Sequence, residues 1–240
     1  MRSLIKAAVL LAMALPLAAQ QQAGKADPTK AVKGTGQLPA GWMMRFDPID
    51  NPANVRPGRT PPAKPTPDMV NVVTMGSGLH FTSGPAAIYY NPKDVASDVY
   101  AVSASFGARK SMQHEAYGIF IGGSNLQDST QSYLYFEIRP GMGDSILIQH
   151  RNGDVASKID KIVPWTSSGG AVNVDDPTDG HSSNTLMIHV APDTVHFMVN
   201  GKLVKALAKS ELMGAKTDGQ AGIRINHNSD LHVDWKGVSK

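Results

Sequence analysis

The sequence predicts an all-β domain, folded as a two-sheet antiparallel sandwich with at most one short helix. From residue 70 onward, short segments rich in β-branched and aromatic residues follow one another, and clusters of Gly, Pro, Asn and Asp separate them. No helical stretches alternate with these segments, which disfavours a parallel sheet. A propeller would repeat about every 40–45 residues, and the sequence has no such period.

The expected strands follow in close succession along the chain. The first is 41–46 (GWMMRF), and a helical turn is expected only at 209–215 (KSELMGA). The remaining expected strands are 70–75, 79–83, 86–91, 98–106, 117–122, 133–139, 145–151, 158–163, 185–191, 195–201, 202–207, 221–228 and 231–238. In 186–190 the alternation predicts that Leu186, Ile188 and Val190 face the core, with Met187 and His189 on the other side.

Turn chemistry predicts how these strands connect. Asn152-Gly153 and Asn200-Gly201 indicate tight type I′ hairpins, because that turn needs positive φ at both central residues. The cluster NPKD, residues 91–94, indicates a further turn.

Residues 1–19 are expected to be a signal peptide. Arg2 and Lys6 precede an apolar run from Ala7 to Leu15, and Ala19 is a small residue suited to the cleavage site. The run is shorter than the roughly 20 apolar residues of a transmembrane helix, and we expect no transmembrane segment. An ordinary N-terminal helix is the alternative, and the polar QQQ that follows at once disfavours it. We therefore expect a secreted or periplasmic protein.

The remainder of the chain is expected to form one domain. Residues 20–40 are polar and aperiodic and predict a flexible lead-in, so the β-sandwich would span 41–240. Within it, residues 48–67 carry too many prolines for a helix or a central strand. This stretch predicts a Pro-rich crossover loop; the alternative is a ligand for an SH3-type domain.

Composition narrows the classes of partner. The chain has no cysteine, so no disulfide supports the fold and a sizeable core must do so. It has 23 basic and 20 acidic residues, and loss of the leader would leave 21 basic ones. With no clustered basic face, we expect no nucleic-acid partner.

Several segments together resemble a known group of proteins. They are GSGLHFTSGPAAIYYNP, AYGIFIGG, YLYFEIR, SILIQHRNGD, VPWT, NTLMIHVAPDTVHFMVNGKLV and TDGQAGIRINHNSDLHVDW. Over about residues 41–236 they resemble secreted bacterial proteins of the concanavalin A-like lectin/glucanase jelly-roll fold, close to domains of unknown function grouped with 3-keto-disaccharide hydrolases.

The resemblance implies a jelly-roll module that binds carbohydrate or a cell-surface glycan. The alternatives are a glycoside hydrolase of the 3-keto-disaccharide type, and a structural or protein-interaction module of the laminin-G-like kind. Fold alone does not choose among them. The oligomeric state is left open.

The expected ligand-binding residues share one face of their strands. A sugar packs its CH faces on aromatic rings and hydrogen-bonds its hydroxyls to polar side chains. Alternate residues on the polar face of two expected strands supply both kinds of side chain. These residues are Tyr133, Tyr135, Glu137, Arg139, Arg224 and Asn226. Residues Leu134, Phe136 and Ile138 are expected to face inward.

No catalytic residue is assigned. Family-16-type glucanases carry two Glu on one strand in the pattern E-x-D-x-x-E, and Glu137 has no such partner in YLYFEIRPG. We expect Glu137 to pair with Arg139 on the same strand face. No Ser-His-Asp arrangement can be derived from spacing.

One loop offers ligands for a metal. Asp175, Asp176 and Asp179 in NVDDPTDGH supply the hard oxygens that calcium prefers. A solvated Asx-turn is the alternative, because Pro177 and the missing bidentate Glu exclude an EF-hand. We expect no other cofactor.

Overall fold

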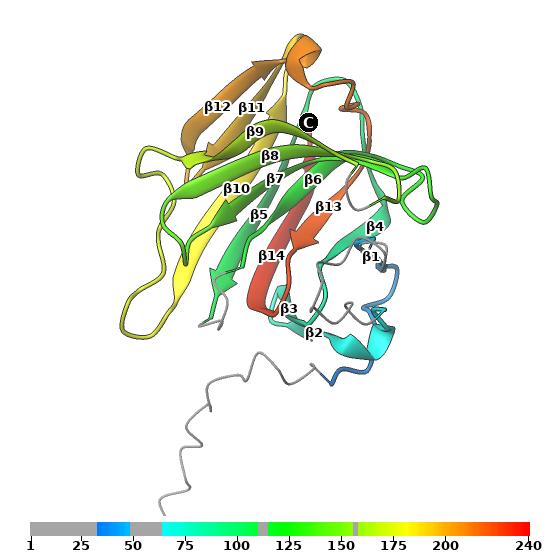
Figure 1. The fold of residues 1–240 in the computed structure, drawn as a ribbon, viewed down its shortest axis with the longest axis vertical. Helices are drawn as coiled ribbons and strands as arrows, with labels where there is room; N and C mark the ends of the chain where they lie inside the picture. The colour runs from blue at the N-terminus through cyan, green and yellow to red at the C-terminus, as the bar shows by residue number, and fades with distance from the viewer. Residues whose placement is uncertain (1–32, 49–63, 110–114, 156–157) are drawn as a thin grey trace, which may run out of the picture.

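Two antiparallel sheets of seven strands each form the molecule. The computed structural model describes residues 33–48, 64–109, 115–155 and 158–240. Sheet A contains, in spatial order, β1 (Met43–Phe46), β4 (Ala87–Ala96), β13 (Gly219–Ile225), β6 (Tyr117–Ser124), β7 (Ser132–Arg139), β8 (Ser145–Asn152) and β9 (Ile159–Ser167). Sheet B contains β12 (Lys202–Ala208), β11 (Thr194–Val199), β10 (Ser182–Val190), β5 (Tyr100–Ala108), β14 (Ser229–Ser239), β3 (Gly78–Ser83) and β2 (Val70–Met75). The predicted all-β sandwich is confirmed (Figure 1).

Every strand expected from the sequence is present, and the described residues contain no α-helix. Short 3-10 turns occur at Pro67–Met69 (η2) and Lys209–Glu211 (η3), the second within the expected helical turn. The turn expected at residues 91–94 is wrong, because these residues continue β4. Tyr90 lies opposite Gly222 and Val95 opposite Gln220, so the Asn-Pro signal marks an irregular register in the ladder and not its end.

One of the two tight hairpins is confirmed. Asn200 and Gly201 have φ values of 51° and 77°, as a type I′ turn between β11 and β12 requires. The prediction for Asn152-Gly153 is wrong, because Asn152 still belongs to β8 and only Gly153 has a positive φ, of 107°. The Asn152 N–H donates to the carbonyl of Lys158, which closes a longer connection to β9.

Apolar side chains from both sheets fill the space between them. Phe136 of β7 packs edge-on against Phe197 of β11, with ring centroids 5.4 Å apart. Leu134, Phe136 and Ile138 are fully buried in this core, as expected from their parity. Leu186, Ile188 and Val190 are likewise buried, so the alternation in β10 is confirmed.

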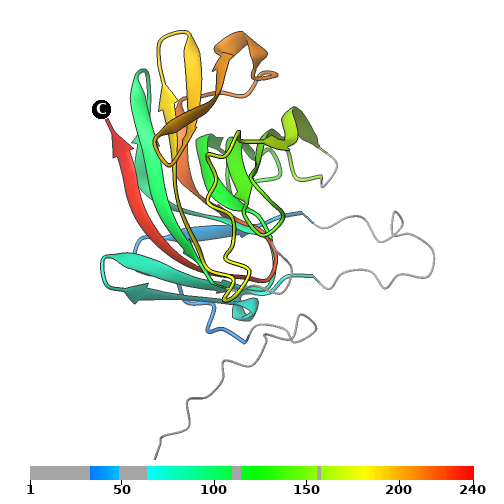
Figure 2. The ribbon, with the colours of Figure 1, turned by 90° about the vertical axis from the view of Figure 1, so that its left-hand side faces the viewer.

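The two sheets differ on the faces that point away from this core. β5 of sheet B alternates buried and partly exposed residues. β6 and β7 of sheet A are buried at nearly every position, because a second apolar cluster covers their outer face. Its members are Ile88, Tyr90, Phe120, Leu126, Tyr133, Tyr135 and Leu147. In Figure 2 the long strands β5 and β14 curve toward the side on which sheet A lies. The outer face of sheet A is therefore on the concave side.

The end of the predicted lead-in is attached to the sandwich. Gly34 and Gly36 donate backbone hydrogen bonds to Asp68 and Val70 at 2.6 and 3.2 Å. The predicted signal peptide and most of the Pro-rich loop lie outside the described residues. Within the described part of the chain, no helix has the length and apolar character needed to cross a membrane.

Candidate functional site

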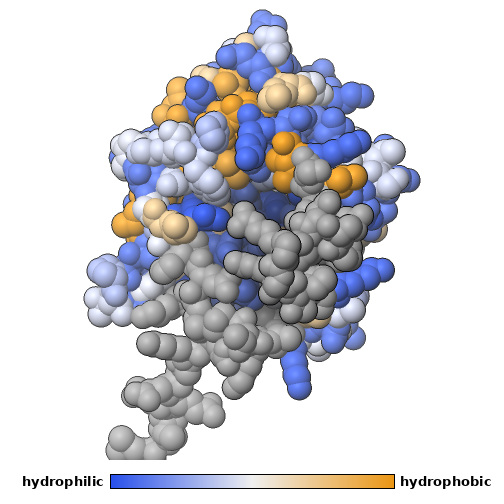
Figure 3. All heavy atoms as spheres, viewed as in Figure 1, coloured by the Kyte–Doolittle hydropathy of each residue, from blue (hydrophilic) through white to orange (hydrophobic). Residues whose placement is uncertain are grey.

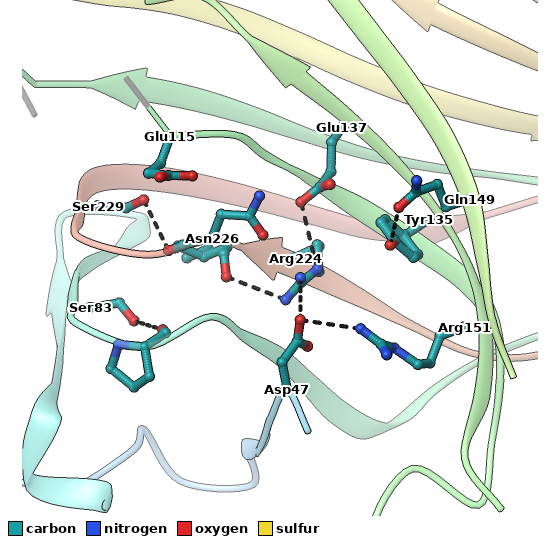
Figure 4. A network of polar contacts seen from close by, with 12 residues as sticks. Asp47, Ser83, Glu115, Tyr135, Glu137, Gln149, Arg151, Arg224, Asn226 and Ser229 are labelled. Atoms are coloured by element: carbon teal, nitrogen blue, oxygen red, sulfur yellow. Dashed lines mark hydrogen bonds and ion pairs between the residues drawn. The ribbon is translucent and has the colours of Figure 1, made fainter. Parts of the chain in front are cut away.

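Polar and aromatic side chains gather on the concave, outer face of sheet A. Tyr133, Tyr135 and Glu137 project there from β7, and Arg224 reaches them from β13, two strands away in the sheet. Tyr133 and Tyr135 lie with ring centroids 5.6 Å apart. The parity predicted from the sequence therefore brings these four residues together, and Figure 4 shows Tyr135, Glu137 and Arg224 among them.

Arg224 is the centre of this arrangement. Its Nη2 lies 2.7 Å from Oδ2 of Asp47, and its Nε lies 3.6 Å from Oε1 of Glu137. The guanidinium carbon also lies 5.5 Å from the centroid of the Tyr135 ring, a cation–π contact. One buried cation thus holds two carboxylates and one aromatic ring.

Two residues of β8 complete the network. Arg151 donates from Nη2 to Asp47 Oδ2 at 3.3 Å, so this carboxylate accepts from two arginines. The Tyr135 hydroxyl donates to Gln149 Oε1 at 2.5 Å. We call Asp47, Tyr135, Glu137, Arg151 and Arg224 the arginine cluster (Figure 4).

Burial controls the charges within the arginine cluster. Loss of solvation raises the pKa of Glu137 to about 7, although the nearby Arg224 cation opposes the rise. Burial by itself disfavours the charged form of Arg224, but Asp47 and Glu137 together hold its pKa above its ordinary value. The protonated form of Glu137 is therefore favoured well above the pH at which a solvated Glu ionises, and Arg224 stays charged.

Several buried polar atoms of the arginine cluster lack a hydrogen-bond partner within the described residues. They comprise two acceptors and two donors: Asp47 Oδ1, Glu137 Oε1, Arg151 Nε and Arg224 Nε. Glu137 Oε1 and Arg224 Nε face each other as an ion pair at 3.6 Å, which leaves the acceptor Asp47 Oδ1 and the donor Arg151 Nε. A buried polar group without a partner costs roughly 1–3 kcal/mol. Both kinds of orphaned atom on one face indicate a site built for something that donates and accepts hydrogen bonds.

Arg139 lies apart from the arginine cluster. The expected pairing of Arg139 with Glu137 is wrong at contact range, because Arg139 instead approaches Glu115, with Nη2 to Oε2 at 3.9 Å, although its charge still lowers the pKa of Glu137. Its guanidinium stacks on Trp165 of β9 at 4.8 Å from the ring centroid. Glu137 pairs with Arg224 because both lie opposite Gly118 of β6, which has no side chain to separate them.

Asn226 follows directly after β13, and two hydrogen bonds of its backbone attach it to neighbouring residues. Its N–H donates to the carbonyl of Ala116, and its carbonyl accepts from the hydroxyl of Ser229. Figure 4 places its side chain beside Arg224 and Glu115. Asn226 thus borders the arginine cluster at the end of the strand.

Asp47 and Arg151 are missing from the ligand-binding residues predicted from the sequence. Arg151 shares the parity of Gln149 on β8, so alternation in SILIQHR could have found it. Asp47 follows β1, about 90 residues away from β7, and carries no local signal. Only the pairing of β1 with β4 brings it to this face.

The acidic loop satisfies its own backbone. Asp176 Oδ1 accepts from the N–H of Thr178 at 2.7 Å, and Asp179 Oδ1 accepts from the N–H of His181 at 2.9 Å. These are Asx-turn bonds. Among the described residues, no three His, Asp or Glu side chains converge as a metal site. The calcium site at Asp175, Asp176 and Asp179 therefore gains no support from the geometry.

Solved structures share this architecture. The carbohydrate-binding module CBM66 from Bacillus subtilis aligns with a TM-score of 0.52 and 8% identity, over 71% of this chain and 92% of its own. A glycoside hydrolase family 16 endo-glucanase from Bacteroides ovatus aligns with a TM-score of 0.52 and 10% identity, over 85% and 96%. The chain has the concanavalin A-like sandwich fold.

This concanavalin A-like sandwich is not assigned to a family. No known family model matches the sequence, and no curated protein matches it. At 8–10% identity the aligned structures establish the fold alone.

Proposed function

We propose that this sandwich binds carbohydrate on the outer face of sheet A. The observation that carries the proposal is the acceptor Asp47 Oδ1 and the donor Arg151 Nε, which are buried in the arginine cluster without a hydrogen-bond partner among the described residues. A sugar hydroxyl donates one hydrogen bond and accepts others, so a polyhydroxylated ligand satisfies both kinds at once. The carbohydrate-binding module and the endo-glucanase with this fold support the same ligand class.

Entry to the arginine cluster begins at Asp47. Its side chain is 21% exposed, whereas those of Glu137 and Arg224 are nearly inaccessible. Figure 3 shows hydrophilic residues gathered in the middle of the face seen in that view. Arg139 stacked on the partly exposed Trp165 extends the face toward β9 and offers an aromatic platform at its margin.

The test is a glycan array probed with the purified protein, with and without calcium. Asp47→Asn keeps the size of the side chain but removes the charge that Arg151 and Arg224 share, and we expect binding to fall at least about tenfold. Asp154→Asn is the matched control, because Asp154 pairs with Arg45 at 2.7 Å outside the arginine cluster. A folded protein that binds no glycan on the array would contradict the proposal.

A glycoside hydrolase of the 3-keto-disaccharide type is the second candidate. The observation that favours it is the raised pKa of Glu137, about 7, close to a second carboxylate at Asp47. A carboxyl group that stays protonated near neutrality is suited to donate a proton to a leaving oxygen. Incubation with 3-keto glycosides tests this candidate: release of free sugar should occur with the wild type and be lost in Glu137→Gln.

We also propose that the protein is exported. Arg2, Lys6 and the apolar run that follows support a cleavable signal peptide. Expression in a bacterial host should yield a periplasmic or secreted form whose N-terminal sequence begins near residue 20. A cytoplasmic product that retains residues 1–19 would contradict this proposal.

A further inference from the structure

A hydrogen-bonded chain of three side chains crosses one edge of sheet A. The Ser132 hydroxyl of β7 lies 2.9 Å from Nε2 of His150 on β8. On the other side of the ring, Nδ1 of His150 lies 3.1 Å from Oδ2 of Asp160 on β9. The strands β7, β8 and β9 are neighbours in that order (Figure 1).

The chemistry of the partners assigns the proton on the ring. An ionised carboxylate can only accept, so Nδ1 of His150 carries the hydrogen that faces Asp160. In the neutral ring, Nε2 is then free to accept from the Ser132 hydroxyl. Serine, histidine and carboxylate are thus connected through the same atoms as in serine hydrolases.

Strand register holds the three residues in place. His150 and Asp160 face each other directly in the β8–β9 ladder. Ser132 pairs with Asn152, so it is the diagonal neighbour of His150 across β7 and β8. Neighbouring positions along a strand point to opposite faces, so His150 points away from Arg151 and this site is separate from the arginine cluster.

Among the three hydrogen-bonded side chains, the middle one, His150, is the least exposed. The His150 side chain is 4% exposed, whereas that of Asp160 is 35% exposed and Ser132 is partly exposed. Burial lowers the pKa of His150 below its ordinary value, although the Asp160 carboxylate and the backbone of Met213 oppose this. A buried neutral imidazole that contacts an accessible hydroxyl is suited to act as a general base.

We propose that Ser132 is the nucleophile of a second site, which cleaves small acyl esters. Ser132 Oγ attacks the carbonyl carbon while its proton passes to His150 Nε2. The ester C–O bond breaks, and the departing alcohol takes that proton. Water then attacks the acyl carbon and passes one proton to His150 Nε2. The bond between the acyl carbon and Ser132 Oγ breaks, the carboxylic acid leaves, and His150 returns the proton to Ser132 Oγ. Asp160 is a positioning residue, which keeps His150 in the tautomer that accepts.

The test uses an alkyl fluorophosphonate, which forms an Oγ–phosphorus bond with an activated serine and releases fluoride. Peptide mapping of the intact, folded protein should place the adduct on Ser132. We expect Ser132→Ala to abolish it, and His150→Gln to slow labelling about a hundredfold. Asp160→Asn should slow labelling at least about tenfold and change its pH profile, because the amide no longer holds the same tautomer.

Ser124→Ala is the matched control. Ser124 of β6 lies opposite Ser132 in the ladder, so it tests an ordinary strand serine at the same end of the sheet. Circular dichroism verifies the fold of each variant, and Asp160 is exposed enough for Asp160→Asn to keep the fold. Absence of an adduct on Ser132 in the folded protein would overturn the proposal. So would labelling of Ser132 at an unchanged rate in Asp160→Asn.

Discussion

At the scale of single residues, Arg224 explains why two carboxylates can lie on a buried face. Burial of each carboxylate costs solvation free energy. The guanidinium offsets part of that cost only where it lies close to the carboxylate oxygens. Asp47 has the close contact, at 2.7 Å, and Glu137 has the longer one, at 3.6 Å. Asp47 is also the carboxylate that Arg151 contacts, whereas the longer contact of Glu137 does not prevent burial from raising its pKa.

Glu137 should make stability depend on pH. In the unfolded chain Glu137 ionises near pH 4.5, but in the fold it stays protonated up to about pH 7. The contribution of Glu137 to the free energy of unfolding should therefore be fully present below pH 4.5 and fall by about 3 kcal/mol as pH rises through 7. Urea unfolding of wild type and Glu137→Gln at pH 4 and pH 8 measures this. The free energy of unfolding of Glu137→Gln should exceed that of the wild type at pH 8 and equal it at pH 4.

At the scale of elements, β7 shows two kinds of burial on one strand. Its inward residues join the core between the sheets, and Tyr133 and Tyr135 join the cluster on the outer face. The sequence predicts the two faces of β7 correctly, but it does not show that the outer face is itself buried: Tyr135 is only 2% exposed. Truncation of Tyr135 should consequently reduce stability as well as ligand binding.

Phe136 should be among the residues that matter most for stability. It is fully buried and packs on Phe197 of the opposite sheet. Phe136→Ala should lower the free energy of unfolding by about 3–5 kcal/mol. Leu203→Ala, at a side chain 57% exposed on the edge strand β12, should change it by less than about 0.5 kcal/mol. Chemical denaturation compares the two, and equal losses would contradict the assignment of the core.

The β11–β12 turn should depend on the Asn200 side chain and not only on its backbone. Asn200 donates from Nδ2 to the Ala171 carbonyl at 2.9 Å and accepts from the Thr185 N–H at 2.8 Å. Asn200→Gly keeps the positive φ but loses these bonds, so we expect a loss of about 1–3 kcal/mol in thermal or urea unfolding. A stability equal to that of wild type would show that conformation alone matters at this turn.

At the scale of the whole molecule, neighbouring strands in each sheet include strands that are far apart in the sequence. β14, the last strand, lies between β5 and β3 in the middle of sheet B, while β1 is an edge strand of sheet A. Removal of a central strand leaves two ladders unpaired, whereas removal of an edge strand affects one.

Two truncations test this difference. Ending the chain at Asn228 removes β14, and we expect the cooperative unfolding transition to disappear. Starting the chain at Asp47 removes β1, and we expect a cooperative transition at lower denaturant concentration. Circular dichroism during urea titration measures both. A cooperative transition in the protein without β14 would contradict the topology.

The sequence by itself determined the fold class, the positions of the strands and which face of β7 and β10 points inward. Side-chain alternation and turn residues act over a few positions, so they can be derived without knowing where the chain goes next. The failures at residues 91–94 and at Asn152 have one cause, because Asn and Gly favour irregular backbone in bulges and longer loops as well as in tight turns.

Only the tertiary structure decided which polar residues meet. Arg224 reaches Glu137 across β6, Asp47 arrives from the first strand, and Ser132, His150 and Asp160 come together from three strands. These meetings depend on strand order and register between segments far apart in the chain, and local propensity contains no information about either. Burial also depends on what covers a face, so the raised pKa of Glu137 follows from the assembled sandwich and not from the residues around it in the sequence.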